Sequence, residues 1–78
     1  MDFELLSDIT EIEPIVKGTS VNVRHYLNRT FGRGRWRKLK GIALIRDLET
    51  DRIGWAEIHW FEAHGIGRKL EKRKRWLE

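Results

Sequence analysis

Residues 39–61 read LKGIALIRDLETDRIGWAEIHWF, and this stretch decides the fold. Two short apolar runs, residues 39–46 and 53–61, lie on either side of a polar segment, residues 47–52. Short apolar runs that flank a polar turn are typical of an antiparallel hairpin. The pattern therefore predicts two paired strands joined by a turn.

The second strand of this hairpin divides its side chains into two sets, because successive residues of a strand point to opposite faces. The apolar set, which we assign to the core, is Ala56, Ile58 and Trp60. The other face carries two aromatic rings with an acid and an imidazole between them: Trp55, Glu57, His59 and Phe61.

A turn centred between residues 49 and 50 fixes the register of the two strands. Four pairs then lie opposite one another: Ala43 and Ala56, Gly41 and Ile58, Lys40 and His59, and Lys38 and Phe61. Side chains of such cross-strand neighbours meet. A slip of one residue would exchange the two faces, so every statement about the faces depends on this register.

An amphipathic helix is predicted over residues 21–31. Val23, Leu27 and Phe31 recur every four positions, and Gly32 stands where a glycine commonly ends a helix. We expect this helix to pack on the shallow surface that Ala43, Ala56, Gly41 and Ile58 form on the hairpin.

A third strand is predicted over residues 68–74, after the turn glycines at 65 and 67, because a lone two-stranded hairpin is seldom stable. The alternative is a helical tail, in which Ile66, Leu70 and Leu77 would share one stripe. The fold class is then α+β, with one amphipathic helix packed on a small antiparallel sheet.

The N-terminal residues predict a further short helix. Leu5, Ile9, Ile12 and Val16 follow at steps of four, three and four, and Pro14 would end the helix near residue 13. Residues 18–20 are expected to connect it to the next element, with Ser20 as the N-cap.

Charge is distributed unevenly along the chain. Residues 1–16 hold five acids and no Lys or Arg, a net charge of −5, whereas residues 17–78 hold all 16 basic residues and seven acids, a net charge of +9. We therefore divide one domain, residues 1–78, into an acidic segment, 1–17, and a basic body, 18–78. The acidic segment is expected to fold across the body, which attracts polyanions such as nucleic acid.

Length and composition restrict the class of protein. A chain of 78 residues can bury enough apolar surface for only one hydrophobic core. It has no cysteine, which points to a reducing cytosol. The longest apolar run, residues 42–45, is far shorter than the roughly 20 residues of a membrane span. We expect a cytoplasmic protein without a membrane partner.

The segment at residues 32–41 places five cations and a tryptophan between glycines. Arginine offers a planar fork to phosphate oxygens, and tryptophan offers a face on which a base can stack. The residues predicted to contact nucleic acid are Arg33, Arg35, Trp36, Arg37, Lys38, Trp55 and Phe61. The alternative is a solvated loop whose Trp36 lies in the core.

The cluster of histidines and charges near residue 59 suggests a second chemistry, the cleavage of RNA without a metal. That reaction needs a base, an acid and cations that stabilise the charged phosphorane, and histidine suits the first two roles. The candidate catalytic residues are His59, Glu57, Lys40, His64 and Arg68. Each also has a plain interpretation as a surface residue or an ion-pair partner.

A metal site at His59, Glu62 and His64 is disfavoured, because residues 59 and 64 point to opposite faces of a strand and are poorly spaced on a helix. We therefore expect no metal and no cofactor. The glycines of residues 65–67 are interpreted as a tight turn, since the pattern is too short for a nucleotide-binding loop.

Two segments, GRWRKLKG at 34–41 and AEIHWFEAHGIGRK at 56–69, resemble a group of short bacterial proteins of uncharacterised function. The core of that group is Trp-Arg/Lys-Lys-x-Lys-Gly followed by Ala-Glu-x-His-Trp-Tyr/Phe-Glu-Ala-His-Gly-Ile-Gly-Lys, and the match covers residues 34–76. The group has apolar residues near positions 71 and 73, where this chain has Glu71 and Arg73. The last strand would then lie at an exposed edge, or the tail would be helical.

The His-Trp-Phe-Glu strand with its Gly-Ile-Gly turn and basic continuation also resembles, more weakly, barnase-like and colicin-like ribonuclease toxin domains. That resemblance implies a helix before an antiparallel sheet that cuts RNA on its face, with His59, Glu57, Lys40 and Arg68 as the positions to test. It rests on fold-level analogy.

Three functions follow as hypotheses. The first is an RNA-interacting protein that acts as a metal-independent ribonuclease of the toxin kind. The second is a nucleic-acid-binding domain without catalysis. The third is a protein-interaction module whose sheet edge pairs with a partner protein or with a second copy.

Overall fold

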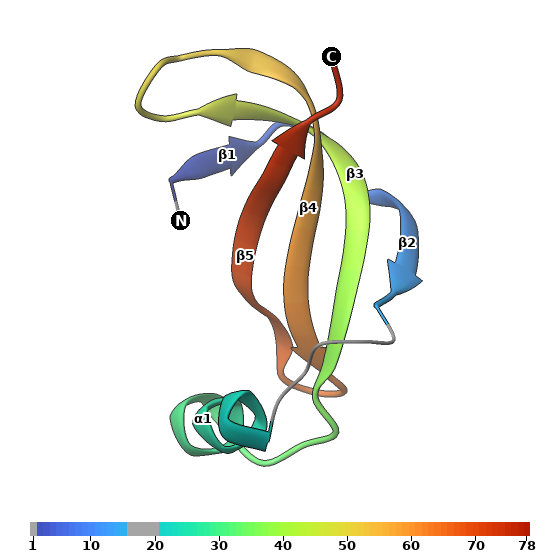
Figure 1. Ribbon diagram of the computed structural model, residues 1–78, viewed down its shortest axis with the longest axis vertical. Coiled ribbons are helices and arrows are strands. Elements are labelled where there is room, and N and C mark those ends of the chain that lie inside the picture. The colour runs from blue at the N-terminus through green and yellow to red at the C-terminus, as the bar shows by residue number, and fades with distance from the viewer. Residues whose placement is uncertain (1, 16–20) are drawn as a thin grey trace.

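The computed structural model describes residues 2–15 and 21–78. These residues form one helix and five strands, and Figure 1 shows how the elements are arranged. The elements follow in the order β1 (Phe3–Leu5), β2 (Thr10–Pro14), α1 (Val21–Phe31), β3 (Arg37–Asp47), β4 (Ile53–Ala63) and β5 (Gly67–Trp76). The strands form one antiparallel sheet in the order β1-β3-β4-β5, with β2 also paired to β3. The described part of the chain has no helix long and apolar enough to span a bilayer.

The β3–β4 hairpin has the predicted register. Lys38 lies opposite Phe61, Lys40 opposite His59, Gly41 opposite Ile58, and Ala43 opposite Ala56. The connecting turn is closed by Asp47, whose carboxylate accepts hydrogen bonds from the backbone N–H groups of Glu49 at 2.8 Å and Thr50 at 3.1 Å. These bonds favour the charged carboxylate, so the pKa of Asp47 lies below its ordinary value.

The prediction of a strand after the second turn is confirmed, since β5 pairs with β4 at the edge of the sheet. Gly65 and Gly67 have φ angles of 82° and 92°, which glycine adopts without strain. The pairing shifts between His59 and Phe61, where Leu70 of β5 has a φ of 56°. Cations on this free edge discourage pairing with another strand.

The prediction of an N-terminal helix is wrong, because these residues form β1 and β2. Both strands pair with the outer edge of β3, and Ser7 Oγ accepts the N–H of Leu44 at 2.9 Å between them. A helix would satisfy its own backbone groups but would leave this edge of β3 unpaired. The strands also bury Phe3, which is 1% exposed. The proposed cap at Ser20 lies outside the described residues.

The main core lies on the inner face of the curled sheet, the face of Ala56, Ile58 and Trp60. It is one cluster of buried residues from four segments: Phe3, Ile9, Leu39, Ala43, Ile45, Ala56, Ile58 and Trp60. The predicted core face of β4 is therefore confirmed. The outer face of the sheet carries the alternate residues of the same strands.

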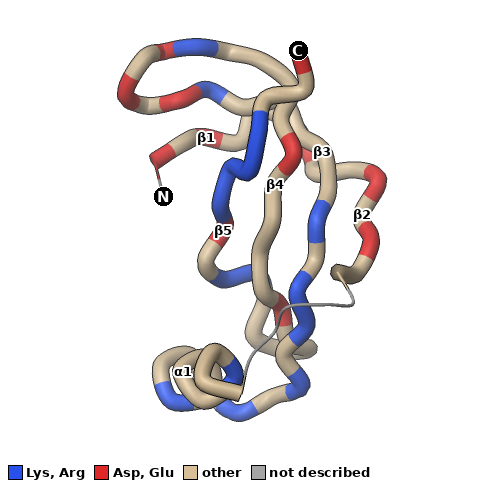
Figure 2. The backbone as a smooth tube through the Cα atoms, viewed as in Figure 1, with Lys and Arg blue, Asp and Glu red and all other residues tan. Residues whose placement is uncertain are grey.

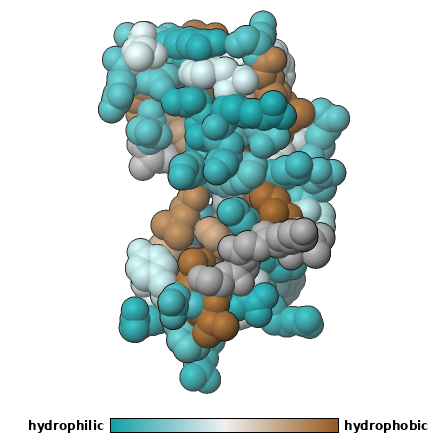
Figure 3. Space-filling model, viewed as in Figure 1, coloured by the Kyte–Doolittle hydropathy of each residue, from teal (hydrophilic) through white to brown (hydrophobic). Residues whose placement is uncertain are grey.

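The helix α1 has the predicted bounds, and Gly32 ends it with a φ of 120°. Its position differs from the prediction. Leu27 packs with Trp36 and Ala63 in a second cluster, which partly buried Val23, Phe31, Phe61 and Ile66 complete. In Figure 3 hydrophobic side chains show where the helix meets the sheet, and hydrophilic ones cover most of the surface above it.

The predicted docking surface on the inner face is occupied by the N-terminal segment, and this explains why the helix packs elsewhere. A Cβ atom built on Gly41 would clash with Ile9 Cγ2 and would lie 2.9 Å from the carbonyl oxygen of Thr10. Ile9 and Thr10 of this segment therefore lie in direct contact with Gly41. No space remains there for a helix.

Replacing Gly41 by alanine should therefore destabilise the protein. The added methyl group must displace the backbone at Thr10, and overpacking of this kind costs about 1–3 kcal/mol. Urea unfolding followed by tryptophan fluorescence measures the change. Lys74→Ala, at an exposed position of β5, is the control and should leave the midpoint unchanged. Equal midpoints for Gly41→Ala and the control would mean that the N-terminal segment does not hold this position.

Candidate nucleic-acid interface

The outer face of the sheet gathers cations around the aromatic and acid–imidazole row of β4. The predicted neighbours Lys38 and Lys40 come from β3. The edge strand β5 adds three more cations, since Lys69 lies opposite Phe61, Lys72 opposite His59, and Arg75 opposite Glu57. The run of cations in the tail indicated that basic residues would lie near this strand. Their positions, however, are set by the two register shifts between β4 and β5, which no sequence pattern predicted.

Glu57 and His59 contact one another on this face. His59 Nε2 and Glu57 Oε2 are 2.8 Å apart, and Arg75 Nη2 lies 3.4 Å from Glu57 Oε1. The pKa of Glu57 lies below its ordinary value, chiefly because of the hydrogen bond with His59 and further because of the charge on Arg75, while partial burial opposes the shift. The side chains of His59 and Glu57 are only 14% and 20% exposed.

The five candidate catalytic residues do not converge on one point. Lys40 Nζ is bound to Glu13 at 3.1 Å instead of reaching His59. Arg68 lies opposite Glu62, and Glu62 is two residues from Trp60 and so points to the same inner face. Arg68 therefore lies on the inner side of the sheet, with its Nε 3.8 Å from Glu71 Oε1.

The remaining candidate, His64, lies exposed at the turn after β4, beside Arg35 and Arg37. Only His59 and Glu57 therefore touch, and His59 Nδ1 is buried without a hydrogen-bond partner. In the described residues no group of His, Asp and Glu could hold a metal ion.

The three aromatic residues predicted to stack on bases differ in burial and in position on the molecule. Trp36 is buried at 6% exposure in the second core cluster, and its indole N–H donates to the carbonyl of Gly32 at 3.1 Å. Phe61 is half-buried against the same cluster. Trp55 is exposed, but it lies near the start of β4, at the opposite end of the strand from the helix.

The arginine-containing loop after α1 is held in place by two contacts. The backbone N–H of Gly34 donates to Asn28 Oδ1 at 3.1 Å. A Cβ atom on Gly34 would lie 2.9 Å from Ala63 Cβ, so the loop passes in close contact over the end of β4. The burial of Trp36 anchors the same loop from below. A fixed loop therefore presents Arg33 and Arg35 to solvent.

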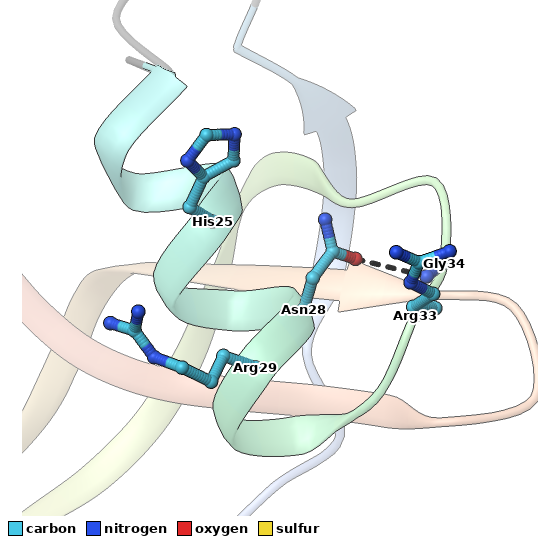
Figure 4. A pocket seen from close by; sticks show the side chains of 5 residues that line it. All are labelled: His25, Asn28, Arg29, Arg33 and Gly34. Atoms are coloured by element: carbon cyan, nitrogen blue, oxygen red, sulfur yellow. Dashed lines mark hydrogen bonds between the residues drawn. The ribbon is translucent and has the colours of Figure 1, made fainter.

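Two adjacent hollows lie between this loop and α1. The first, about 580 Å³, is drawn in Figure 4 and is lined by His25, Asn28, Arg29, Arg33 and Gly34. The second, about 470 Å³, is lined by Arg24, Asn28, Gly34, Arg35, Trp36 and Arg37. We call the two hollows and their lining residues the arginine end.

The helical members of the arginine end, Arg24, His25, Asn28 and Arg29, were not singled out as contact residues from the sequence. Two signals could have found them. Residues 24 and 28, and residues 25 and 29, are four apart and so are neighbours on one helix surface. The sequence also contains no Asp or Glu between Pro14 and Arg46.

The five arginines of the arginine end have no carboxylate partner within 4 Å among residues 2–15 and 21–78. This holds for Arg24, Arg29, Arg33, Arg35 and Arg37. In contrast, five cations of the sheet each lie within 4 Å of a carboxylate: Lys40, Arg46, Arg68, Arg73 and Arg75. Figure 2 shows this separation, with blue and no red on α1 and the loop that follows it.

The acidic segment accounts for part of this difference. As predicted, it folds against the basic body, where Glu13 binds Lys40 and Glu4 binds Arg46, both on β3. It neutralises the side of the sheet and leaves the arginine end uncompensated.

No family model matches the chain, and neither the curated proteins nor the solved structures contain a significant match to it.

The contacts of Glu57 predict how stability depends on pH. Because the pKa of Glu57 in the folded protein is below its ordinary value of 4.5, ionisation of this group stabilises the fold above that pH. The contribution is lost as the pH falls through the lower, folded pKa. We expect Glu57→Gln to be less stable than the wild type at pH 7 and to approach it as the pH is lowered below 4.5.

Urea midpoints measured between pH 7 and pH 3 test this. Asp47, whose pKa is also lowered, titrates in both proteins, so the difference between the two curves isolates Glu57. Parallel curves over the whole range would show that the contacts with His59 and Arg75 do not favour the charged form.

Proposed function

We propose that this protein binds RNA through the arginine end and contacts the phosphate backbone. The observation that carries the proposal is the set of five exposed arginines without an acidic partner in the described part of the chain, gathered on a helix and a loop that are fixed against one another. The guanidinium group forms two parallel hydrogen bonds with phosphate oxygens and keeps its charge at any physiological pH.

Electrostatics favour this end of the molecule over the sheet. A cation that already lies against a carboxylate must lose that partner before it binds a phosphate, whereas an unpaired arginine releases only solvent and counterions. Binding at the arginine end therefore has the smaller cost. The potential of an uncompensated cluster also extends over about one Debye length, roughly 8 Å at physiological salt.

The positions of the aromatic rings support recognition of the backbone and not of the bases. Trp36 is buried, and Phe31 and Phe61 belong to the cluster that joins helix and sheet. The aromatic ring of α1 that is exposed is Tyr26, at 43%. With few stacking faces available, affinity should vary little among RNA sequences of equal length.

The geometry around His59 supports binding without cleavage. Metal-free cleavage requires an acid and a base that both reach the reacting phosphate. Here the imidazole is largely buried and bound to Glu57, while Lys40 is bound to Glu13. Neither His64 nor Arg68 lies on the same patch of the outer face.

Substitution of the loop arginines tests the binding proposal. The triple variant Arg33→Gln, Arg35→Gln, Arg37→Gln should bind single-stranded RNA about tenfold or more weakly at low salt. Each phosphate contact contributes about 0.7 to the slope of log affinity against log salt, so the loss of one to two contacts should lower the slope by about 1. Fluorescence anisotropy across a salt titration measures both quantities.

The matched control removes the same charge elsewhere. Arg52, Lys72 and Lys74 are exposed and come from the β3–β4 turn and from β5. Their triple change to Gln should cost much less affinity. Equal losses in the two triple variants would show that total charge, and not the arginine end, determines binding.

The ribonuclease hypothesis has its own test. Purified protein incubated with total RNA in the presence of a chelator should leave the RNA intact, and this is read on a denaturing gel. Cleavage by the wild type that disappears in His59→Ala would overturn this expectation and would support the catalytic set. Cleavage that persists in His59→Ala would point to a contaminating nuclease or to another centre.

A further inference from the structure

We infer that the two hollows of the arginine end bind two neighbouring phosphates of one RNA strand, and that Asn28 forms the wall between them and contacts both. This inference rests on the proposed function and makes its site specific. Residues of α1 that do not belong to the sheet would then contact the RNA.

The wall consists of a hydrogen bond between helix and loop. Asn28 and Gly34 line both hollows, and the bond from the Gly34 N–H to Asn28 Oδ1 joins them, as the dashed line in Figure 4 shows. Gly34 cannot move inward, since its α-carbon already lies against Ala63. The division of this surface into two hollows is therefore a fixed feature of the fold.

Each hollow has its own set of donors. The first is lined by Arg29 and His25 of α1 and by the loop residue Arg33. In the second, Arg24 of α1 is joined by two loop arginines, Arg35 and Arg37. Helical spacing and the loop thus distribute the five arginines over two places, and neither hollow is lined by a carboxylate.

The orientation of the Asn28 amide places hydrogen-bond donors on the wall between the two hollows. Because Oδ1 accepts the Gly34 N–H, the other end of the amide is Nδ2, which carries two N–H donors. Within the described residues Nδ2 has no acceptor. A pair of donors on the shared wall suits two acceptors, one in each hollow, and phosphate oxygens are acceptors only.

The arrangement also defines where the site ends. A third hollow continues from Arg35 and Arg37 toward His64, but it is lined by Glu62 as well. A carboxylate repels phosphate, so the strand should leave the protein surface at this point. Two phosphates, and not a longer track, are then the unit that is bound.

Asn28→Asp is the decisive variant, with Thr30→Asp as its control. Aspartate at 28 keeps an oxygen that accepts the Gly34 N–H, but it replaces the two N–H donors by a carboxylate oxygen. Thr30 is exposed on the same helix and lines neither hollow. Because both variants replace a neutral side chain by a carboxylate, they change the net charge equally. Retention of the Gly34 amide signal in NMR spectra would show that the loop is intact.

We expect Asn28→Asp to weaken binding of single-stranded RNA about tenfold or more and Thr30→Asp to weaken it about twofold or less. Equal effects of the two variants would overturn the inference about Asn28. They would not affect the proposed function, which the loss of affinity in the arginine triple variant tests separately.

The number of subsites is tested with two double variants. Arg29→Gln with Arg33→Gln empties the first hollow, and Arg35→Gln with Arg37→Gln empties the second. Each should lower the salt slope by about 0.7, and the quadruple variant should lower it by about 1.4. A loss confined to one double variant would leave one phosphate site and would refute the pair.

Discussion

The register of the β3–β4 hairpin is the constraint on which the rest of the structure depends. It sets Ala56, Ile58 and Trp60 against the inner residues of β3, so the core has one face from which to grow. It also leaves the outer edge of β3 free, and the N-terminal strands fill that edge. Because Ile9 and Thr10 of the N-terminal segment cover Gly41 on the inner face, the helix lies at the end of the sheet, where it packs against the arginine loop.

Five cations of the sheet lie against carboxylates, whereas none of the five arginines of the arginine end has such a partner in the described part of the chain. The N-terminal segment brings Glu4 and Glu13 to cations of β3 while it completes the sheet, so one segment serves both packing and charge balance. No comparable segment reaches the helix and the loop after it. The surface available to a polyanion is thus defined as much by where the carboxylates lie as by where the arginines lie.

Local periodicity predicted the elements that depend on local pattern. Alternation in β4, four-residue spacing in α1 and the glycine turn before β5 gave the hairpin, the helix bounds and the third strand. Local periodicity gave the wrong structure for the N-terminal segment. The spacing of Ile9 and its apolar neighbours fits a helix, and only the unpaired edge of β3 makes a strand preferable. Of the predicted contact residues, Arg33 and Arg35 are exposed, and their contact with nucleic acid stays a prediction. The burial of Trp36 and the face of Arg68 depend on tertiary packing and on register, which composition does not encode.

The separation of charge gives the molecule a dipole along its long dimension of 35 Å. The positive pole is the arginine end. The β3–β4 turn at the opposite end carries Glu49 and Asp51 beside Arg52, and Figure 2 shows both red and blue on that turn. In the field of a polyanion such a body experiences a torque before it makes contact. It should arrive helix first, so a larger fraction of encounters begins in the productive orientation. Added salt would then slow association more than it speeds dissociation.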